Sequence, residues 1–147
     1  MMIRKMEQKD SEAFVEMSNE FYHSDAVLHS IPESFIRKTF DELMAGSPYI
    51  DGYIFECDGE EAGYSLLSIT YSNEAGGLVV WVEEIYILPK FQGRGIGKEY
   101  MDFIEEAYKG KAARIRLEVE EANERAINIY KNKGYKQLDY VQMYKGK

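Results

Sequence analysis

The sequence has little cysteine, proline or histidine, and it lacks a long apolar run. Its 147 residues include 1 Cys, 3 Pro and 2 His. A single cysteine, Cys57, cannot form an internal disulfide, and its place in an apolar strand pattern predicts a core thiol in a reducing compartment. No stretch approaches the ~20 apolar residues of a membrane span, and residues 1–7 lack the apolar core of a secretion signal. We therefore expect a cytoplasmic protein without a membrane partner.

Positive charge is also scarce. The chain has 18 Lys and Arg against 26 Asp and Glu, a net charge of -8, and its pI is about 4.9. Because phosphate backbones require a basic face, we expect no nucleic-acid partner, and a cationic substrate fits better. The two histidines, His23 and His29, lie in an expected loop with no third ligand nearby, so we expect no metal site.

What the chain does have is enough apolar residues for one core. It is 45% hydrophobic, and it shows no repeats or flexible linkers, so residues 1–147 are expected to form a single domain. Alternating apolar patterns predict strands at residues 2–6, 50–57, 61–71, 78–88 and 114–119. Helical spacing predicts four helices: one capped by Asp10 or Ser11 and ending near residues 22–25, one between a capping box at 30–33 and Gly46, one with apolar positions over 96–107, and one over 123–133.

Turn signals predict how these strands connect. Asp58-Gly59 is a strong hairpin signal, and residues 73–77 make the next reversal, which indicates an antiparallel meander. The strand at 78–88, the helix after it and the strand at 114–119 form a β-α-β crossover, so this last pair should be parallel. A hairpin around Asp139 is expected to complete the chain. The predicted fold class is α/β, with a mixed sheet.

A glycine-rich turn lies between the fourth expected strand and the third expected helix. Three glycines, Gly93, Gly95 and Gly97, remove the Cβ atoms that would hold a ligand away from the main chain. The helix that begins there offers unpaired N–H donors and the positive end of its dipole. The pattern therefore predicts a site for an anionic cofactor.

Two familiar phosphate-binding motifs fit this turn poorly. In a P-loop alignment the first glycine falls on Gln92 and the hydroxyl that binds magnesium falls on Glu99. In a dinucleotide fingerprint the third glycine comes one residue early, and Pro89 with three further residues separates the strand from the turn. Glu118 lies where a ribose-binding acid would be, about twenty residues on, so a nucleotide-dependent oxidoreductase stays open as a third interpretation.

The turn resembles instead the pyrophosphate-binding signature of the GNAT N-acetyltransferase superfamily, Q/R-x-x-G-x-G/A. This chain has Gln92-Gly93-Arg94-Gly95-Ile96-Gly97. The preceding strand also resembles the family, with Glu83-Glu84-Ile85-Tyr86-Ile87-Leu88-Pro89, and so does the later segment, with Asn123, Tyr130 and Gly134-Tyr135. The resemblance covers about residues 78–140, and the first half of the chain matches only in element order. It implies a GNAT-like fold, in which an antiparallel meander precedes a β-α-β crossover and the two central parallel strands splay apart to admit acetyl-CoA.

The same resemblance assigns the residues that bind acetyl-CoA. The backbone N–H groups of Gln92 to Gly97 would hold the pyrophosphate, with positive charge from Arg94 and Lys98. The N–H of Ile85 would polarise the acetyl carbonyl, and the main chain of Ile87 would pair with the pantetheine arm. The complete predicted set is Ile85, Ile87, Gln92, Gly93, Arg94, Gly95, Ile96, Gly97, Lys98 and Asn123. Asn123 would contact the pantetheine arm or a water, or cap the last helix, or do both.

Acetyl transfer to an amine also needs a proton acceptor and a proton donor. The resemblance makes Glu83 the acceptor, often through a water. A carboxyl of pKa about 4.3 is a weak base for an ammonium of pKa about 10.4, so without burial or a relay Glu83 would mainly hold the substrate cation. Glu84 follows on the same strand and should point to the opposite face. Tyr130 would donate a proton to the departing thiolate, with a packed core tyrosine as the structural alternative.

The acceptor site in this family is lined by the loop between the first two helices. We therefore predict substrate contacts from Tyr22, His23, Asp25 and Glu84. The chain is expected to be an acetyl-CoA-dependent N-acetyltransferase that acts on the amine of a small cationic molecule by direct attack in a ternary complex. Similar proteins are often dimers, so a homodimer is a further prediction. The alternative is a non-catalytic acyl-CoA-binding or sensing domain, and the sequence leaves the acceptor amine open.

Overall fold

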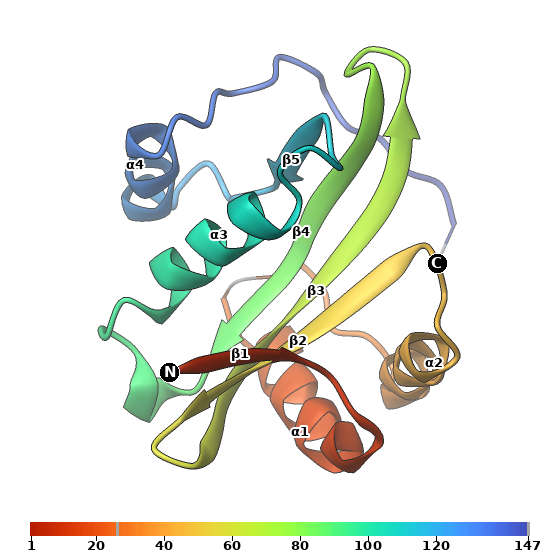
Figure 1. Cartoon of the computed structure of the whole chain (residues 1–147), viewed down its shortest axis with the longest axis vertical. Coiled ribbons are helices and arrows are strands. Elements are labelled where there is room, and N and C mark those ends of the chain that lie inside the picture. Colours follow the sequence, from red (N-terminus) through yellow and green to blue (C-terminus); the bar gives the residue numbers. More distant parts are fainter. Residues whose placement is uncertain (26, 147) are drawn as a thin grey trace.

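The computed structural model describes residues 1–25 and 27–146. Within this part of the chain, five strands form one mixed sheet in the order β1-β2-β3-β4-β5 (Figure 1). The strands are β1 (Met2–Lys5), β2 (Ile50–Cys57), β3 (Glu60–Ser72), β4 (Gly77–Ile87) and β5 (Arg114–Leu117). Neighbours pair antiparallel from β1 to β4, whereas β4 and β5 pair parallel. The predicted meander and crossover are thereby confirmed.

Helices cover both faces of the sheet. The described residues form α1 (Ser11–Tyr22), α2 (Glu33–Met44), α3 (Ile96–Ala107) and α4 (Glu124–Asn132), with short 3-10 turns at Gln8–Asp10 and Pro89–Phe91. Helices α1 and α2 pack on one face and α3 on the other (Figure 1). No helix among these residues is long and apolar enough to cross a membrane. Cys57 is a buried free thiol in the α3-side core, as its strand pattern predicted.

The start of α2 differs from the predicted capping box. The N-cap residue is Pro32, which offers no side-chain acceptor. Glu33 does not reach back along the chain, because its carboxylate accepts hydrogen bonds from Asn19 and Arg37. The N-terminus of α2 is therefore fixed by the contacts of Glu33 with Asn19 of α1 and with Arg37 of α2, and not by a cap from Ser30.

The pairing between the two parallel strands, β4 and β5, is short. Their ladder runs from Val79↔Arg114 to Val82↔Leu117. Strand β4 continues to Ile87, whereas β5 ends at Leu117. The edge of β4 that faces β5 therefore has no strand partner from residue 83 to residue 87, and such strand edges accept extended ligands.

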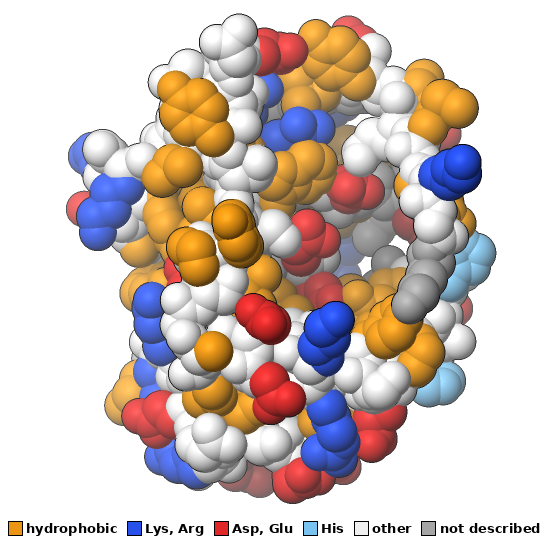
Figure 2. Space-filling model, turned by 90° about the vertical axis from the view of Figure 1, so that its right-hand side faces the viewer, with side chains coloured by type: hydrophobic (Ala, Val, Ile, Leu, Met, Phe, Trp, Pro, Cys, Tyr) orange, Lys and Arg blue, Asp and Glu red, His pale blue; other side chains and the backbone are white. Residues whose placement is uncertain are grey.

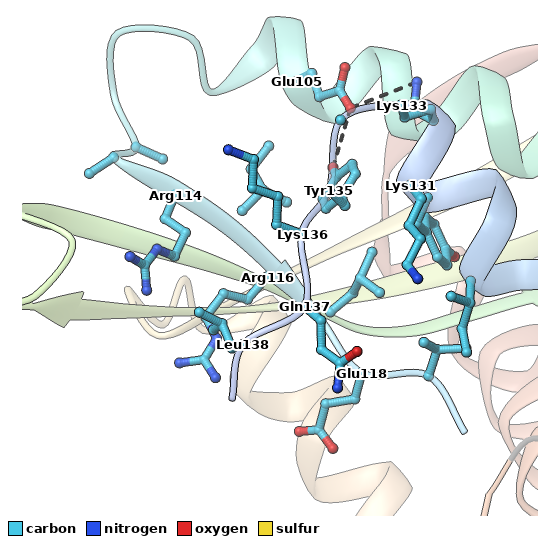
Figure 3. Close-up of a pocket in the computed structure, with 18 of the residues that line it drawn as sticks. Glu105, Arg114, Arg116, Glu118, Lys131, Lys133, Tyr135, Lys136, Gln137 and Leu138 are labelled. Carbon is cyan, nitrogen blue, oxygen red and sulfur yellow. Dashed lines mark hydrogen bonds and ion pairs between the residues drawn. The ribbon is translucent and has the colours of Figure 1, made fainter. Parts of the chain in front are cut away.

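The predicted hairpin around Asp139 is wrong, because residues 136–146 contain no strand. Tyr140 in this segment donates a hydrogen bond to Glu74 at the β3–β4 turn (2.9 Å). Val141 and Met143 are each 91% exposed. A cavity of about 1030 Å³ remains between β5, α4 and residues 133–142 (Figure 3).

Candidate active site

The glycine-rich turn joins β4 to α3 and opens toward solvent. Gly93 and Gly95 both have φ of +80°, a left-handed conformation that glycine adopts without a steric cost. A Cβ atom at either position would meet nothing within 4 Å. The space in front of the main chain is therefore free for a ligand, as the sequence predicted.

Backbone donors point from this turn without acceptors. Gly95 is the N-cap of α3 and provides no side-chain cap. Among the described residues, no group accepts a hydrogen bond from the backbone N–H groups of residues 93–98. Unpaired N–H groups at a helix N-terminus favour an anion, and phosphate satisfies several of them together. The turn is therefore suited to an anionic group such as a phosphate.

Some side chains of the turn are engaged in contacts with the rest of the protein, and one is free to bind a ligand. Gln92 donates through Nε2 to the carbonyl oxygen of Ile87 (3.0 Å), which ties the turn to the end of β4. Arg94 contacts Asp58 (3.2 Å) and stacks on Phe91. Lys98 is exposed and has no ion pair within the part of the chain that the structure describes. Lys98 is thus the cation of this turn that is most available to a ligand.

Ile85 and Ile87 lie on the unpaired part of β4, and their side chains pack in the α3-side core. Tyr130 on α4 is partly buried against the α3-side core, with its ring 5.8 Å from that of Tyr135. Burial raises the pKa of Tyr130, and its hydroxyl has no hydrogen-bond partner among the described residues. Asn123 is the N-cap of α4, since its Oδ1 accepts from the N–H of Ala126 (3.2 Å). The capping role is confirmed, and a cofactor contact by Asn123 stays a prediction.

A β-bulge places the two consecutive glutamates on the same sheet face. Leu67 pairs with Val82, but Leu66 pairs with Glu84, so Glu83 is an extra residue in β4. Its carboxylate accepts a hydrogen bond from the hydroxyl of Ser68 (2.9 Å). Ser68 lies two residues from Leu66 on β3 and therefore shares its face, which packs against α1 and α2. The expectation of opposite faces is wrong, because a bulge interrupts the alternation of side chains.

The environments of the two carboxylates differ. Glu83 is exposed, whereas Glu84 accepts hydrogen bonds from the hydroxyls of Tyr22 and Tyr64, the latter at 2.6 Å. Burial raises the pKa of Glu84 even though both phenols stabilise its anion. Burial also raises the pKa of both tyrosines, so they stay protonated and donate.

Of the four residues predicted to contact the acceptor substrate, Tyr22 and Glu84 are in contact with each other, and the other two are not in contact with them. Tyr22 is the last residue of α1 and reaches Glu84 across the sheet face. His23 contacts the carbonyl oxygen of Asn19 on its own helix (2.6 Å), and Asp25 is exposed. Figure 2 shows a hollow in one face of the molecule, with both acidic and basic side chains around it.

Tyr64 is a neighbour of this site that sequence reasoning missed. It is fully buried in the α1 and α2 side core. A tyrosine in a buried strand needs a partner for its hydroxyl, and this is the signal in the sequence. Its partner, Glu84, depends on the bulge in the neighbouring strand.

Comparison with known proteins decides the family. The model of the acetyltransferase (GNAT) family matches residues 11–135. The chain belongs to this family. It is an acetyl-CoA-dependent N-acetyltransferase, as its motifs predicted.

Curated relatives carry the same activity class in their names. An uncharacterised N-acetyltransferase in the pepI 3' region of Lactobacillus delbrueckii subsp. lactis is 32% identical over 144 residues, which covers 90% of this chain and 82% of the relative. The thialysine N-epsilon-acetyltransferase of Mus musculus is 26% identical over 150 residues, with 92% and 84% covered.

Solved structures share the fold. The aminoglycoside N-acetyltransferase AAC(6')-Iy in complex with CoA has a TM-score of 0.78 at 19% identity, covering 99% of this chain and 93% of the other. A possible acetyltransferase from Clostridium difficile 630 has a TM-score of 0.81 at 16% identity, with 99% and 96% covered. Identities this low support the mixed-sheet GNAT fold and no finer conclusion.

Proposed function

We propose that residues 1–147 act as one domain that transfers the acetyl group of acetyl-CoA to the amine of a small molecule, by direct attack in a ternary complex. The observation that carries the proposal is the unpaired run of N–H donors at residues 93–98 beside the open edge of β4. The carboxylates of Glu83 and Glu84 lie on the same strand, within the residues that follow the last β4–β5 pair.

The binding roles follow from this arrangement. The N–H groups of residues 93–98 and the ammonium of Lys98 hold the diphosphate. The open edge of β4 at Ile87 pairs with the pantetheine arm, and the N–H of Ile85 polarises the acetyl carbonyl. When bound, acetyl-CoA supplies an acetyl group activated as a thioester.

Proton transfer uses the exposed Glu83 and the partly buried Tyr130. Glu83 accepts the proton of the substrate ammonium, directly or through a water, and Ser68 orients its carboxylate. Glu84 positions Tyr22 and Tyr64 and adds negative charge to the acceptor side. The raised pKa of Tyr130 keeps its phenol protonated at neutral pH, which is the form that a general acid requires.

The acceptor is proposed to be a small cationic amine. The neighbouring carboxylates of Glu83 and Glu84 and the net charge of -8 support a cation. Relatives and structural neighbours whose names include thialysine and aminoglycosides also support small-molecule acceptors. A cytoplasmic location, without nucleic-acid or membrane partners, completes this proposal and is supported by the buried thiol of Cys57 and the acidic surface.

A homodimer is proposed as the assembly. The outer edge of β5 is unpaired within the described chain, and the apolar side chains of Val141 and Met143 are 91% exposed. A second copy would cover both. Light scattering after size-exclusion chromatography should give the mass of two chains, and the mass of one chain would contradict this.

The test is a screen of amines with acetyl-CoA, followed by detection of the free CoA thiol. Turnover with at least one amine, lost or strongly reduced in Glu83→Gln, would support the proposal. If the protein binds acetyl-CoA but releases no CoA with any amine, and Tyr130→Phe changes nothing, the chain is a non-catalytic acyl-CoA-binding domain instead.

A further inference from the structure

Three neighbouring strands bring a carboxylate and a guanidinium to the same level of the same sheet face. Trp81 of β4 pairs with Ser68 of β3 on one side and with Arg116 of β5 on the other. Val80 and Val82 belong to the α3-side core, so Trp81 between them faces the other side, which is the side of Ser68 and of the Glu83 carboxylate bound to it.

The guanidinium of Arg116 is held in place but has no acidic partner. It stacks over the Trp81 ring at 3.9 Å from the ring centroid. A guanidinium that lies over an aromatic ring can still offer N–H donors at its rim to a bidentate acceptor. No carboxylate among the described residues lies within 4 Å of it. Arg116 is also partly buried, in a chain with 26 acidic residues.

Arg114 provides an internal comparison. It lies two residues earlier on the same strand, and both arginines project from the same side of β5 beside the cavity of about 1030 Å³ (Figure 3). Arg114 forms an ion pair with Glu74 (3.5 Å). The charge of Arg114 is paired with a carboxylate, whereas that of Arg116 has no such partner among the described residues. Arg116 is therefore the arginine that is available to a ligand.

We propose that Arg116 binds a carboxylate of the acceptor, so that the acceptors of this enzyme are amino acids or related ω-amino carboxylates. This inference rests on the proposed function. The Glu83 carboxylate lies beside Ser68 of β3, and the Arg116 guanidinium of β5 lies over Trp81 of β4. Because neighbouring strands are about 4.8 Å apart, the two charged groups are separated by one to two strand spacings. A carbon chain of lysine length bridges such a span, with its amine at Glu83 and its carboxylate at Arg116. The specificity residue is thus distinct from the residues that move protons.

The test compares ε-aminocaproate with ε-aminocaproamide, which have the same chain and amine and differ in the carboxylate. A charge-assisted hydrogen bond contributes enough for a preference of about tenfold to a hundredfold in kcat/KM for the carboxylate. In Arg116→Gln the preference should vanish, mainly through a higher KM for ε-aminocaproate, with turnover of the amide unchanged. Arg116→Lys should restore part of it, and Arg114→Gln should retain it.

Equal kcat/KM for the two compounds in the wild-type enzyme overturns the inference and leaves the proposed function standing. A preference that survives in Arg116→Gln overturns it as well. If neither these compounds nor any other amine releases CoA, the proposed function fails, and this inference fails with it. The wild-type comparison needs no variant, so poor folding of Arg116→Gln would not remove the test.

Discussion

The role of the glycine-rich turn at the start of α3 can be tested with two matched glycine substitutions. Gly95 has φ of +80° and Gly46 has φ of +77°, and a Cβ atom at either position would meet nothing within 4 Å. Alanine in this conformation costs about 1–2 kcal/mol. For a domain of this size, 1 kcal/mol lowers Tm by roughly 2–4 °C. Both variants should therefore lose the same stability, because the strain is the same and no clash is added.

Only one of the two glycines lies where the diphosphate is proposed to bind. The methyl group of Gly95→Ala enters the space in front of the N–H donors, whereas that of Gly46→Ala enters solvent at the end of α2. Loss of one charge-assisted hydrogen bond costs about 1.5–3 kcal/mol, so Kd for acetyl-CoA should rise about tenfold to a hundredfold in Gly95→Ala.

Isothermal titration with acetyl-CoA and thermal unfolding measure the two effects separately. We expect equal Tm losses, with weaker binding in Gly95→Ala and wild-type binding in Gly46→Ala. Equal affinity in both variants would refute the assignment of the turn as the diphosphate site. Weaker binding in Gly46→Ala would show that general destabilisation explains the effect.

Two further predictions concern the partly buried side chains of Glu84 and Tyr130. Because burial raises the folded-state pKa of Glu84 above its ordinary 4.5, Glu84 favours folding most below that pH, and this contribution is lost as pH rises through its folded pKa. Denaturant unfolding should therefore show a smaller loss of stability above pH 4.5 in Glu84→Gln than in wild type, and parallel pH profiles would contradict this. Tyr130→Phe should lower kcat about a hundredfold with unchanged Kd for acetyl-CoA; unchanged kcat would leave Tyr130 a packing residue.

Local patterns predicted most of the fold and the cofactor turn. Gly93 and Gly95 have positive φ, which glycine adopts without a steric cost. Their conformation could be predicted because it depends on the residue type within the turn. The cap by Asn123 is equally local, since its acceptor lies three residues away. Such features depend on neighbours in sequence, and a sequence alone contains them.

Long-range register could not be predicted in the same way. The bulge at Glu83 depends on how β3 and β4 align, and it moved Glu83 to the face of Glu84. The contacts of Glu84 with Tyr22 and Tyr64 join residues 62 and 20 positions apart. The stacking of Arg116 on Trp81 requires the parallel pairing after the crossover. The hairpin predicted around Asp139 is absent from the described residues. Its strands would have needed to pair with the edge of the sheet, and the local sequence pattern does not specify such pairing.

Direct attack of the amine on the thioester, with Glu83 as the proton acceptor, can be tested in a single-turnover reaction in which free CoA and acetylated amine are counted together by mass spectrometry. We expect one acetylated amine for each CoA released, no acetylated protein before the amine is added, and a slower step in Glu83→Gln. Release of CoA without acetylated amine, or an acetylated protein that accumulates before the amine is added, would contradict direct attack.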